Sequence, residues 1–533
     1  MESMVIRMRS CSLGVLIVLS ACSSVGERPD AAAGWTAVDS ARVDAILAPL
    51  VAAHAFMGAV VFVRDGKVVH AQGLGMADVA AGRAFAPATP ADGGSLAKTL
   101  TAAAVWTLVH EGRIAIDTPV TAYVPDYPYA GTTVRQLVAH THGLPPYYEA
   151  FDPHFGPNEV RTTAALLAVV RRAMPQPRFA PGTRFEYSNL GFDAAALVVE
   201  RVTGQSIGAF FRSRFFAPLA MDSAFARPGR LADFPRLRTM GYRWADTAWV
   251  IADVFDNEAF IGGSNVYFSV LDLARWAAPH ACGTALPQAV QSLGQARPVI
   301  DGRSSPINGL SWYCDDAGDR CQYTGDNTAF HSLVYWDRAR GAAVAMVSNS
   351  SLAPWTLITL QRDLVAALEG RAPDRTPRAA FVGVTRDERA SVAGRYAMPG
   401  ADTITVTDSR TGLRLRVGSD LAFDVFQVAP AEFYVPGLDH FLGFSGEANA
   451  RRMHVRSMFV DFVAPRVPWS GERCHQPREA YFVLNVLRET SSVSRVRPST
   501  CRRAESGLAA QVSATIRGGT ATRDHARREN RYT

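Results

Sequence analysis

A serine and a lysine stand three residues apart, at Ser95 and Lys98, where a long apolar stretch begins. On a helix, positions i and i+3 share a face, so the hydroxyl and the amine can come within hydrogen-bond distance. A serine hydroxyl is a weak nucleophile, and a lysine in apolar surroundings loses its charge and can accept the proton. The N-terminus of the helix adds partial positive charge where an oxyanion would form. The pair is a candidate nucleophile with its base.

The composition sets Lys98 apart, because this chain uses arginine for nearly all of its cations. Of the 55 Lys and Arg residues, only Lys67 and Lys98 are lysines. Lysine can lose its proton at physiological pH, whereas arginine cannot. Lys67 follows Asp65-Gly66, a hairpin signal between apolar runs at 59–64 and 68–74, so it is explained as a turn residue in solvent. Lys98 is therefore the lysine for which a chemical role explains the choice of lysine over arginine.

Two further segments carry side chains suited to proton transfer or substrate binding. Tyr187 and Asn189 lie in a loop between a turn and a helical pattern and can point to one side, the phenol to relay a proton and the amide to orient its neighbours. Without context, the same residues are a half-buried aromatic and a helix N-cap. Tyr323-Thr324-Gly325-Asp326 is expected on an edge strand, where a glycine lets a substrate approach the backbone.

The patterns of apolar residues predict a mixed α/β domain around these segments. Helical spacing predicts a largely buried helix from Ser95 to Val109, ending near Glu111-Gly112. Further helices are expected at 164–172, 191–202, 207–216 and 270–278, and strands at 59–64, 68–74, 334–335 and 342–348. Strands at both ends with helices between them predict that the termini of the domain meet in one sheet.

The whole chain of 533 residues is long enough for more than one folded unit. Period-two patterning after a Pro- and Arg-rich linker predicts a small β-rich domain, a barrel or a sandwich. We expect a signal peptide at 1–22, a tether at 23–36, the α/β domain at 37–369, the linker at 370–379, the β-rich domain at 380–466 and a basic tail at 467–533. Residues 471–533 hold 12 Arg and 6 acidic residues, which accounts for the whole net charge of +6, so no nucleic-acid partner is expected.

The N-terminus has the pattern of an export signal, with Arg7 and Arg9 before an apolar run. Leu19-Ser20-Ala21-Cys22 resembles the lipobox of bacterial lipoproteins, and this resemblance implies cleavage before Cys22 and acylation of its thiol. Ser23 in place of a retention Asp favours an outer membrane. The alternative is an ordinary secretory signal. We therefore expect an extracytoplasmic protein held to a membrane by an N-terminal lipid, with no later membrane-spanning segment.

The cysteines and the histidine pair are weaker signals. Cys314 and Cys321 bracket a polar turn that could bring them together, and disulfides persist outside the cytosol. No C-x-x-C spacing supports a zinc ribbon or a redox site. His140 and His142 form an H-x-H without a nearby carboxylate or third histidine, so they are expected to hold a loop beside the pocket, and neither a metal nor a cofactor is predicted. His331 could line the site, or be a satisfied strand histidine.

Taken in order, the three segments resemble the serine β-lactamase and penicillin-binding protein superfamily, most closely its class C branch with D-alanyl carboxypeptidases and esterases. The S-x-x-K motif is similar to Ser95–Lys98, the Y-x-N motif to Tyr187–Asn189, and the third motif to Tyr323–Asp326. Shorter phrases at 137–144, 179–182, 218–221 and 272–275 extend the resemblance over about residues 40–366. It implies a transpeptidase-like domain with helices around an antiparallel sheet, and the segment after the linker is similar to a lipocalin-like domain.

The resemblance implies a role for each site residue. Ser95 is the acylated nucleophile, Lys98 and Tyr187 share its proton, and Asn189 positions the substrate. The backbone N–H groups of Ser95 and Asp326 form the oxyanion hole, and water releases the acyl group without a metal.

Tyr323 is the one departure from the family pattern, which usually has Lys or His at that place. A phenol offers one hydrogen bond but no full charge, so anionic substrates should bind less well. This favours an esterase or amidase acting on a small-molecule or peptide substrate. The alternatives are a class C β-lactamase or D-Ala-D-Ala carboxypeptidase, and a surface binding lipoprotein without turnover.

Overall fold

The computed structural model describes most of residues 35–371 and the strands of residues 385–467. The described ranges are 35–145, 154–156, 159–229, 233–234, 238–245, 247–253, 258–284, 286–300, 303–305, 307–352, 354–371, 385–397, 403–409, 412–417, 421–429, 431–435, 440–447, 451–456 and 461–467. The described residues do not include the expected signal peptide with Cys22, most of the tether, most of the linker or the basic tail after Val467. The domain boundaries given above therefore stay predictions.

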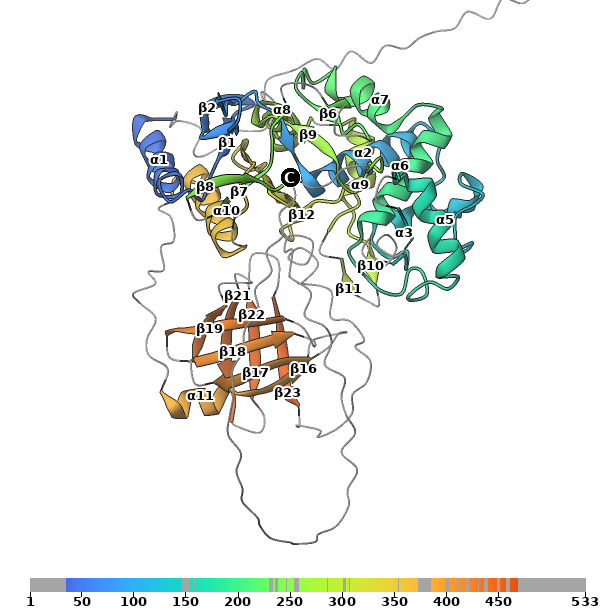
Figure 1. Ribbon diagram of the computed structural model, residues 1–533. Helices are drawn as coiled ribbons and strands as arrows, with labels where there is room; N and C mark the ends of the chain where they lie inside the picture. Colours follow the sequence, from blue (N-terminus) through green and yellow to red (C-terminus); the bar gives the residue numbers. More distant parts are fainter. Residues whose placement is uncertain are drawn as a thin grey trace, which may run out of the picture. The chain divides into compact units, whose positions relative to one another are not determined.

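An antiparallel sheet of order β12-β13-β14-β15-β1-β2 forms the centre of the first folded part (Figure 1). Its strands are β1 (Gly58–Arg64), β2 (Lys67–Leu74), β12 (Tyr313–Cys314), β13 (Arg320–Asn327), β14 (Phe330–Asp337) and β15 (Ala342–Ser348). Because β1 pairs with β15, the two ends of this part meet in one sheet. The expected mixed α/β architecture with an antiparallel sheet is confirmed.

The β1–β2 hairpin has the two-residue turn that its sequence predicts. Asp65 and Gly66 both have positive φ, 48° and 74°, as a turn matching the twist of the strands requires. Lys67 begins β2 and is exposed, so it is a solvated residue beside the turn.

Helices cover both faces of the sheet, because alternate residues of its strands point to opposite sides. Val60 and Phe62 pack with α1 (Ala37–Ala52) and α10 (Pro354–Leu368), which lie side by side in Figure 1. Val61 and Val63 belong to the larger core on the other face, with α2 (Ala97–His110), α6 (Asn189–Thr203) and α8 (Val270–Ala281).

The remaining elements are short helices and strands outside the central sheet. The helical ones are η1 (Gly94–Leu96), η2 (Val120–Ala122), α3 (Val134–Val138), α5 (Thr163–Ala173), α7 (Ile207–Phe211), η3 (Arg212–Phe216) and α9 (Gln288–Gln295). The short strands are β3 (Met76–Asp78), β4 (Arg83–Ala84), β5 (Ala91–Asp92), β6 (Phe225–Ala226), β7 (Tyr242–Ala245), β8 (Ala248–Ile251), β9 (Val266–Phe268), β10 (Val299–Ile300) and β11 (Arg303–Ser304). The single helix expected at 207–216 is instead α7 followed by a π-helical turn, η3.

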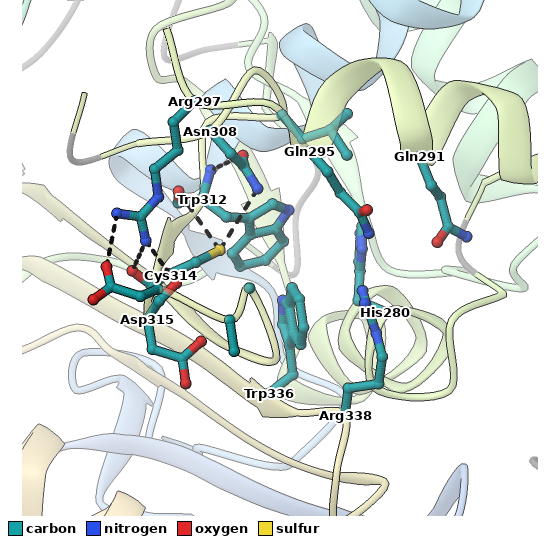
Figure 2. A pocket seen from close by; sticks show the side chains of 14 residues that line it. His280, Gln291, Gln295, Arg297, Asn308, Trp312, Cys314, Asp315, Trp336 and Arg338 are labelled. Atoms are coloured by element: carbon teal, nitrogen blue, oxygen red, sulfur yellow. Dashed lines mark hydrogen bonds and ion pairs between the residues drawn. The ribbon is translucent and has the colours of Figure 1, made fainter. Parts of the chain in front are cut away.

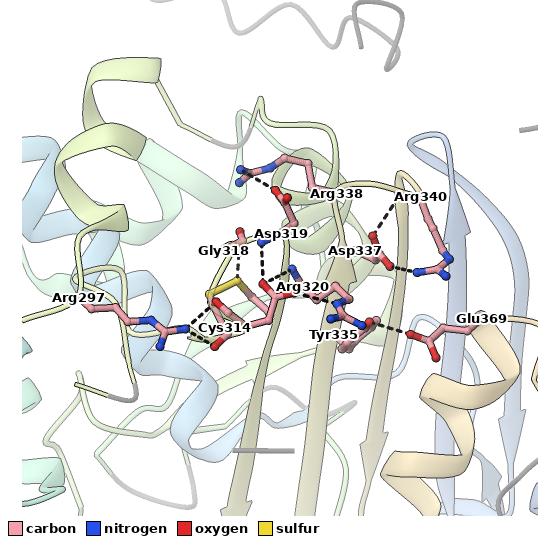
Figure 3. A network of polar contacts seen from close by, with 12 residues as sticks. Arg297, Cys314, Gly318, Asp319, Arg320, Tyr335, Asp337, Arg338, Arg340 and Glu369 are labelled. Carbon is pink, nitrogen blue, oxygen red and sulfur yellow. Dashed lines mark hydrogen bonds and ion pairs between the residues drawn. A yellow bond between two sulfur atoms is a disulfide. The ribbon is translucent and has the colours of Figure 1, made fainter. Parts of the chain in front are cut away.

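A disulfide closes the β12–β13 hairpin, a pairing that the sequence allows but does not decide. Cys314 pairs with Cys321 across the ladder, and their sulfur atoms are bonded. Charged side chains surround this end of the sheet, and Figure 3 shows Tyr335, which donates a hydrogen bond of 3.2 Å to Glu369. Asp315 accepts a hydrogen bond of 2.8 Å from Arg320. The contact of Asp315 lies within the turn of the hairpin, and that of Tyr335 joins β14 to Glu369, directly after α10.

The second folded part is all β, in agreement with the period-two pattern. The strands β16 (Gly394–Ala397), β17 (Thr403–Ser409), β18 (Gly412–Val417), β19 (Leu421–Ala429), β20 (Glu432–Val435), β21 (His440–Ser445), β22 (Arg452–Arg456) and β23 (Asp461–Val467) form a closed antiparallel barrel, preceded by α11 (Arg386–Val392). Alternate residues such as Ile404 and Val406, or Leu413 and Leu415, are buried in its interior. Among the residues described, no helix is both long and apolar enough to cross a bilayer.

Candidate active site

Ser95 lies in the short 3₁₀ turn η1, immediately before α2, rather than in the first turn of the helix as the sequence predicts. Gly94 has a positive φ of 51° and turns the chain sharply just before Ser95. The two expected partners still share one side, since Lys98 Nζ is 3.0 Å from Ser95 Oγ. The structure therefore brings the predicted nucleophile and base into direct contact.

Lys98 is fully buried, with 0% of its surface exposed. Its Nζ hydrogen-bonds Ser95 Oγ, the Gly263 carbonyl oxygen at 2.6 Å and Asn189 Oδ1, three groups that carry no charge. Burial disfavours the charged ammonium form of a lysine. An uncharged amine fits the same geometry, because it can donate to the two carbonyl oxygens and accept from the Ser95 hydroxyl. The arrangement suits a general base.

Tyr187 contacts the same serine from the loop before α6. Its hydroxyl donates to Ser95 Oγ over 2.7 Å, and its ring centroid is 4.7 Å from Lys98 Nζ. Asn189 is the first residue of α6. Its side-chain oxygen Oδ1 accepts a hydrogen bond from Lys98 Nζ and so does not face open space. The structure thus brings together Ser95, Lys98, Tyr187 and Asn189. The phenol of Tyr187 is within proton-transfer distance of Ser95 Oγ.

His140 and His142 support this loop. His140 stacks on the ring of Tyr187 with 4.6 Å between centroids, and its Nδ1 accepts a 3.0 Å hydrogen bond from the Ser188 N–H. His142 Nδ1 accepts from the Leu144 N–H at 2.9 Å. Burial holds the pKa of His140 well below its usual value and lowers that of His142 to about 3, so both rings are neutral at physiological pH. Within the described ranges, no group of three or more His, Cys, Asp or Glu residues is arranged to hold a metal.

The third segment lies along β13, which approaches the turn that carries Ser95. A Cβ on Gly325 would stand 1.9 Å from the Gly93 carbonyl oxygen, and one on Gly94 would stand 2.7 Å from the Asp326 nitrogen. Only glycines allow the two backbones to come this close. In the structure the neighbour of Gly325 is the turn of the nucleophile, and the approach of a substrate to this glycine stays a prediction.

The hydrogen-bond pattern of the β13–β14 hairpin decides where the Asp326 N–H points. Asn327 and Phe330 close a two-residue turn, and hydrogen-bonded and non-hydrogen-bonded pairs then alternate along the ladder. Asp326 and His331 form a non-hydrogen-bonded pair, so the Asp326 N–H points out of the sheet edge, toward η1. β12 pairs with β13 at Cys321 and Gln322, so in the part of the chain described this edge is open beside Asp326. The direction of the Asp326 N–H is the one that the expected oxyanion hole requires, and its role there together with the Ser95 N–H stays a prediction.

The side chains of the third segment are less available than its backbone. Tyr323 is 2% exposed and packs between Trp312 and Tyr313. Asp326 accepts a 2.6 Å hydrogen bond from His331 Nδ1, and His331 Nε2 in turn accepts from the Leu352 N–H, so His331 is a satisfied strand histidine. Thr324 alternates with Tyr323 and is half-buried. We expect the backbone N–H of Asp326, and not its carboxylate, to contact a substrate.

The structure adds positioning residues that the sequence does not single out. Asp193 Oδ1 accepts a 2.8 Å hydrogen bond from the Gly263 N–H and so fixes the carbonyl that holds Lys98. Asp92 Oδ1 accepts one of 2.8 Å from the Gly94 N–H, and its Oδ2 accepts one of 2.8 Å from Asn327. Burial raises the pKa of Asp92 to about 6, so at neutral pH the carboxylate can accept both. Asp92 thereby ties the turn of Ser95 to the strand end beside Asp326.

We expect Asp92→Asn to lower kcat for an activated ester by about 10-fold while KM stays within about twofold. The reason is that the carboxylate that links the turn of Ser95 to the strand end beside Asp326 is lost. An amide cannot accept from both Gly94 and Asn327, although it keeps the size of the side chain. Asn327→Ala removes one of the two links and should have a smaller effect. If kcat and the folded fraction, measured by thermal unfolding, fell by the same factor, Asp92 would contribute to stability and not to catalysis.

The amino-acid sequence of this chain is similar to those of several known proteins. A family model described as Beta-lactamase matches residues 43–377. Penicillin-binding protein 4* of Bacillus subtilis (strain 168) is 26% identical over 179 residues, covering 34% of this chain and 40% of that protein. D-aminopeptidase of Brucella ovis is 28% identical over 226 residues, 41% of each chain. The chain therefore matches less than two thirds of the length of these relatives.

Solved structures share the fold at low sequence identity. The octameric penicillin-binding protein homologue from Pyrococcus abyssi has a TM-score of 0.55 at 21% identity, covering 81% of this chain and 96% of that one. The D-amino acid amidase from Ochrobactrum anthropi SV3 has a TM-score of 0.52 at 21% identity, covering 62% of this chain and 98% of that one.

Proposed function

The chain belongs to the beta-lactamase family, and from that premise we propose that it is a serine hydrolase that cleaves an amide or ester through an acyl intermediate on Ser95. One observation carries the proposal: Lys98 Nζ and the Tyr187 hydroxyl both lie within 3.0 Å of Ser95 Oγ. A buried amine and a phenol on one serine oxygen provide a base for the attack and an acid for the leaving group.

The reaction that we propose has two halves. Lys98 takes the proton of Ser95 as Oγ bonds to the substrate carbonyl carbon, and the negative oxygen is held by the N–H groups of Ser95 and Asp326. Tyr187 gives its proton to the leaving nitrogen or oxygen as that bond breaks, and the proton on Lys98 replaces it. Water then attacks the acyl group by the reverse sequence and frees Ser95.

The substrate class follows from the third segment. The phenol of Tyr323 supplies no positive charge for a substrate carboxylate, and its burial among aromatic rings supports the same conclusion. The relatives include a D-aminopeptidase and a D-amino acid amidase, whose names indicate amide substrates. We therefore propose a small amide or ester substrate. The alternatives, a class C β-lactamase or D-Ala-D-Ala carboxypeptidase and a binding protein without turnover, predict different adducts.

Intact-mass spectra after exposure to p-nitrophenyl acetate, a penicillin and a D-Ala-D-Ala peptide separate these functions. The proposal predicts an acetyl adduct on Ser95, turnover of the ester and little or no penicilloyl adduct. A persistent penicilloyl adduct with poor ester turnover would favour a penicillin-binding role. Ester turnover equal to that of Ser95→Ala would remove the hydrolase proposal and leave a binding protein.

We also propose that the protein is an extracytoplasmic lipoprotein, anchored to a membrane through Cys22. The lipobox pattern of Leu19–Cys22 supports this proposal. In a Gram-negative host we expect the wild-type chain in the membrane fraction, and Cys22→Ala to be released into the soluble periplasmic fraction or retained as the unprocessed precursor. Unchanged membrane recovery of a processed Cys22→Ala chain would contradict a lipid anchor at this residue.

A further inference from the structure

Cys282 is disulfide-bonded, and the other described residues contain no cysteine left over to be its partner. Their two cysteines, Cys314 and Cys321, are bonded to each other. Figure 2 shows Cys314 in the wall of a cavity of about 280 Å³, where Asn308 donates to its sulfur over 3.5 Å. The partner of Cys282 is therefore a cysteine outside the described residues.

The sequence narrows the choice of this partner. The cysteines outside the described residues are Cys11, Cys22, Cys474 and Cys501. Cys11 lies in the expected signal peptide, and acylation blocks the thiol of Cys22 if the proposed lipid anchor is present. The two cysteines of the basic tail, Cys474 and Cys501, remain.

A fixed element presents Cys282 at the surface. Cys282 is the C-cap of α8, and its N–H donates to carbonyl oxygens of the last helical turn. Two residues earlier, the ring of His280 packs against those of Trp312 and Trp336, with centroids 5.1 Å and 5.8 Å away (Figure 2). These contacts hold the end of the helix in the core. Cys282 itself is half-buried, so another segment of the chain can approach it.

A groove of about 500 Å³ lies beside Cys282, between the end of α8 and the β1–β2 turn. Figure 1 shows α8 next to β2, and residues of these two elements contact each other. The wall includes Val68, which is 49% exposed and so offers apolar surface to an occupant. No residue of the proposed mechanism lines the groove. The apolar wall residues are Val63, Val68, Leu219, Ala274, Ala278 and Pro279.

The basic tail contains an apolar run that such a groove can cover. Residues 481–487, Tyr-Phe-Val-Leu-Asn-Val-Leu, have apolar side chains at every position but one. Leaving these side chains in water is unfavourable. The run begins 7 residues after Cys474 and ends 14 residues before Cys501. A bond from Cys282 to Cys474 therefore holds the run closer to the groove than a bond to Cys501 does.

We propose that a disulfide between Cys282 and Cys474 fastens the basic tail to the first folded part, and that residues 481–487 lie in the groove beside α8. Seven extended residues span at most about 25 Å, so the run can reach a groove that Cys282 itself lines. The bond makes docking intramolecular, so contacts too weak to persist between separate molecules become populated. The proposal goes beyond hydrolysis at Ser95 and depends on the proposed lipid anchor only to exclude Cys22.

The bond forms by thiol–disulfide exchange, which suits a protein outside the cytosol. The oxidant is a disulfide of a thiol–disulfide oxidoreductase. The thiols of Cys282 and Cys474 lose one proton each and two electrons in total as their sulfur atoms join. The S–S bond of the oxidant breaks, takes up these two electrons and two protons, and becomes two thiols.

Peptide mapping without reduction tests the pairing in full-length protein exported by a Gram-negative host. Free thiols are first blocked with iodoacetamide, and trypsin then places Cys282, Cys474 and Cys501 on three different peptides, because arginines separate them. We expect the peptide with Cys282 to be linked to the peptide with Cys474, and Cys501 to carry the blocking group. The link between Cys314 and Cys321 is the internal control.

The matched variants are Cys474→Ser and Cys501→Ser. The first should free the thiol of Cys282, which then takes the blocking group. The second should leave the bond of Cys282 in place. Thermal unfolding shows, independently of any hydrolase activity, that each variant is folded.

Limited proteolysis tests the docking, because chymotrypsin cleaves after aromatic residues such as Tyr481 and Phe482 only when the run is open. We expect cleavage of the run to be about tenfold faster than in wild type both in Cys474→Ser and in Val68→Asp, which places a charge in the apolar wall. Val299→Asp is the matched control, since Val299 is also an exposed strand valine but does not line the groove. It should be cleaved at the wild-type rate.

Three results would overturn the proposal. They are a Cys282 that carries the blocking group in wild type, a Cys282 linked to Cys22 or Cys501, and equal cleavage of the run in wild type, Val68→Asp and Cys474→Ser. A link to Cys22 would also contradict the lipid anchor. The other results would leave the anchor and the hydrolase function as they stand.

Discussion

Lys98→Arg should lower the rate of Ser95 acylation by about 10³-fold or more, although it keeps the positive charge. Arginine does not lose its proton in proteins, so it cannot accept the proton of Ser95. General-base catalysis contributes about 10²–10⁴-fold, and loss of the hydrogen bond that orients Ser95 Oγ adds to this loss. The rate of p-nitrophenyl acetate turnover and the rate of acetyl adduct formation measure the effect.

The chain offers its own control for this substitution. Lys67→Arg changes the only other lysine, which is exposed at the start of β2, and should leave both rates unchanged. Because arginine is larger than lysine at a fully buried position, Lys98→Met serves as a second variant that removes the amine without adding volume. Near wild-type acylation in either Lys98 variant would show that another group is the base.

Tyr187→Phe should lower kcat/KM for ester and amide substrates by about 10²–10⁴-fold, with the larger loss for amides. The change removes the hydroxyl that lies 2.7 Å from Ser95 Oγ and leaves the ring that stacks on His140. An amide nitrogen leaves poorly without a proton, whereas a nitrophenolate leaves readily, so the loss should depend on the leaving group.

Tyr129→Phe is the matched control for Tyr187→Phe. This substitution also removes a tyrosine hydroxyl, which donates to the Met174 carbonyl oxygen at 3.1 Å and does not contact Ser95. This variant is expected to lower stability slightly and to leave kcat/KM unchanged. If Tyr187→Phe reduced ester and amide turnover by the same small factor, Tyr187 would be a packing residue and not the acid.

The local parts of the site could be predicted from the sequence. Ser95 and Lys98 are three residues apart, and Tyr187 and Asn189 two, so helix and loop geometry alone place each pair together. The preference for arginine elsewhere made Lys98 conspicuous. The β1–β2 hairpin and the pairing of Cys314 with Cys321 were also local, since a short turn brings their residues together.

The long-range parts could not be predicted in the same way. Asp92 contacts Asn327 from 235 positions away, and Lys98 contacts the Gly263 carbonyl from 165 positions away. Such contacts depend on how the sheet and helices pack, which no local pattern encodes. The start of α2 was also misplaced, because the positive φ of Gly94 produces a 3₁₀ turn where the apolar spacing continues without a break.

The central claim is that Lys98 is an uncharged amine beside Ser95, and ¹⁵N NMR of the lysine side chains tests it most directly. Because the chain has two lysines, ¹⁵Nζ labelling gives two signals, and the exposed Lys67 provides the reference of a solvated ammonium. At pH 7 we predict one ammonium signal from Lys67 and one amine signal that disappears in Lys98→Arg. Two ammonium signals at pH 7, both titrating together at alkaline pH, would contradict the account.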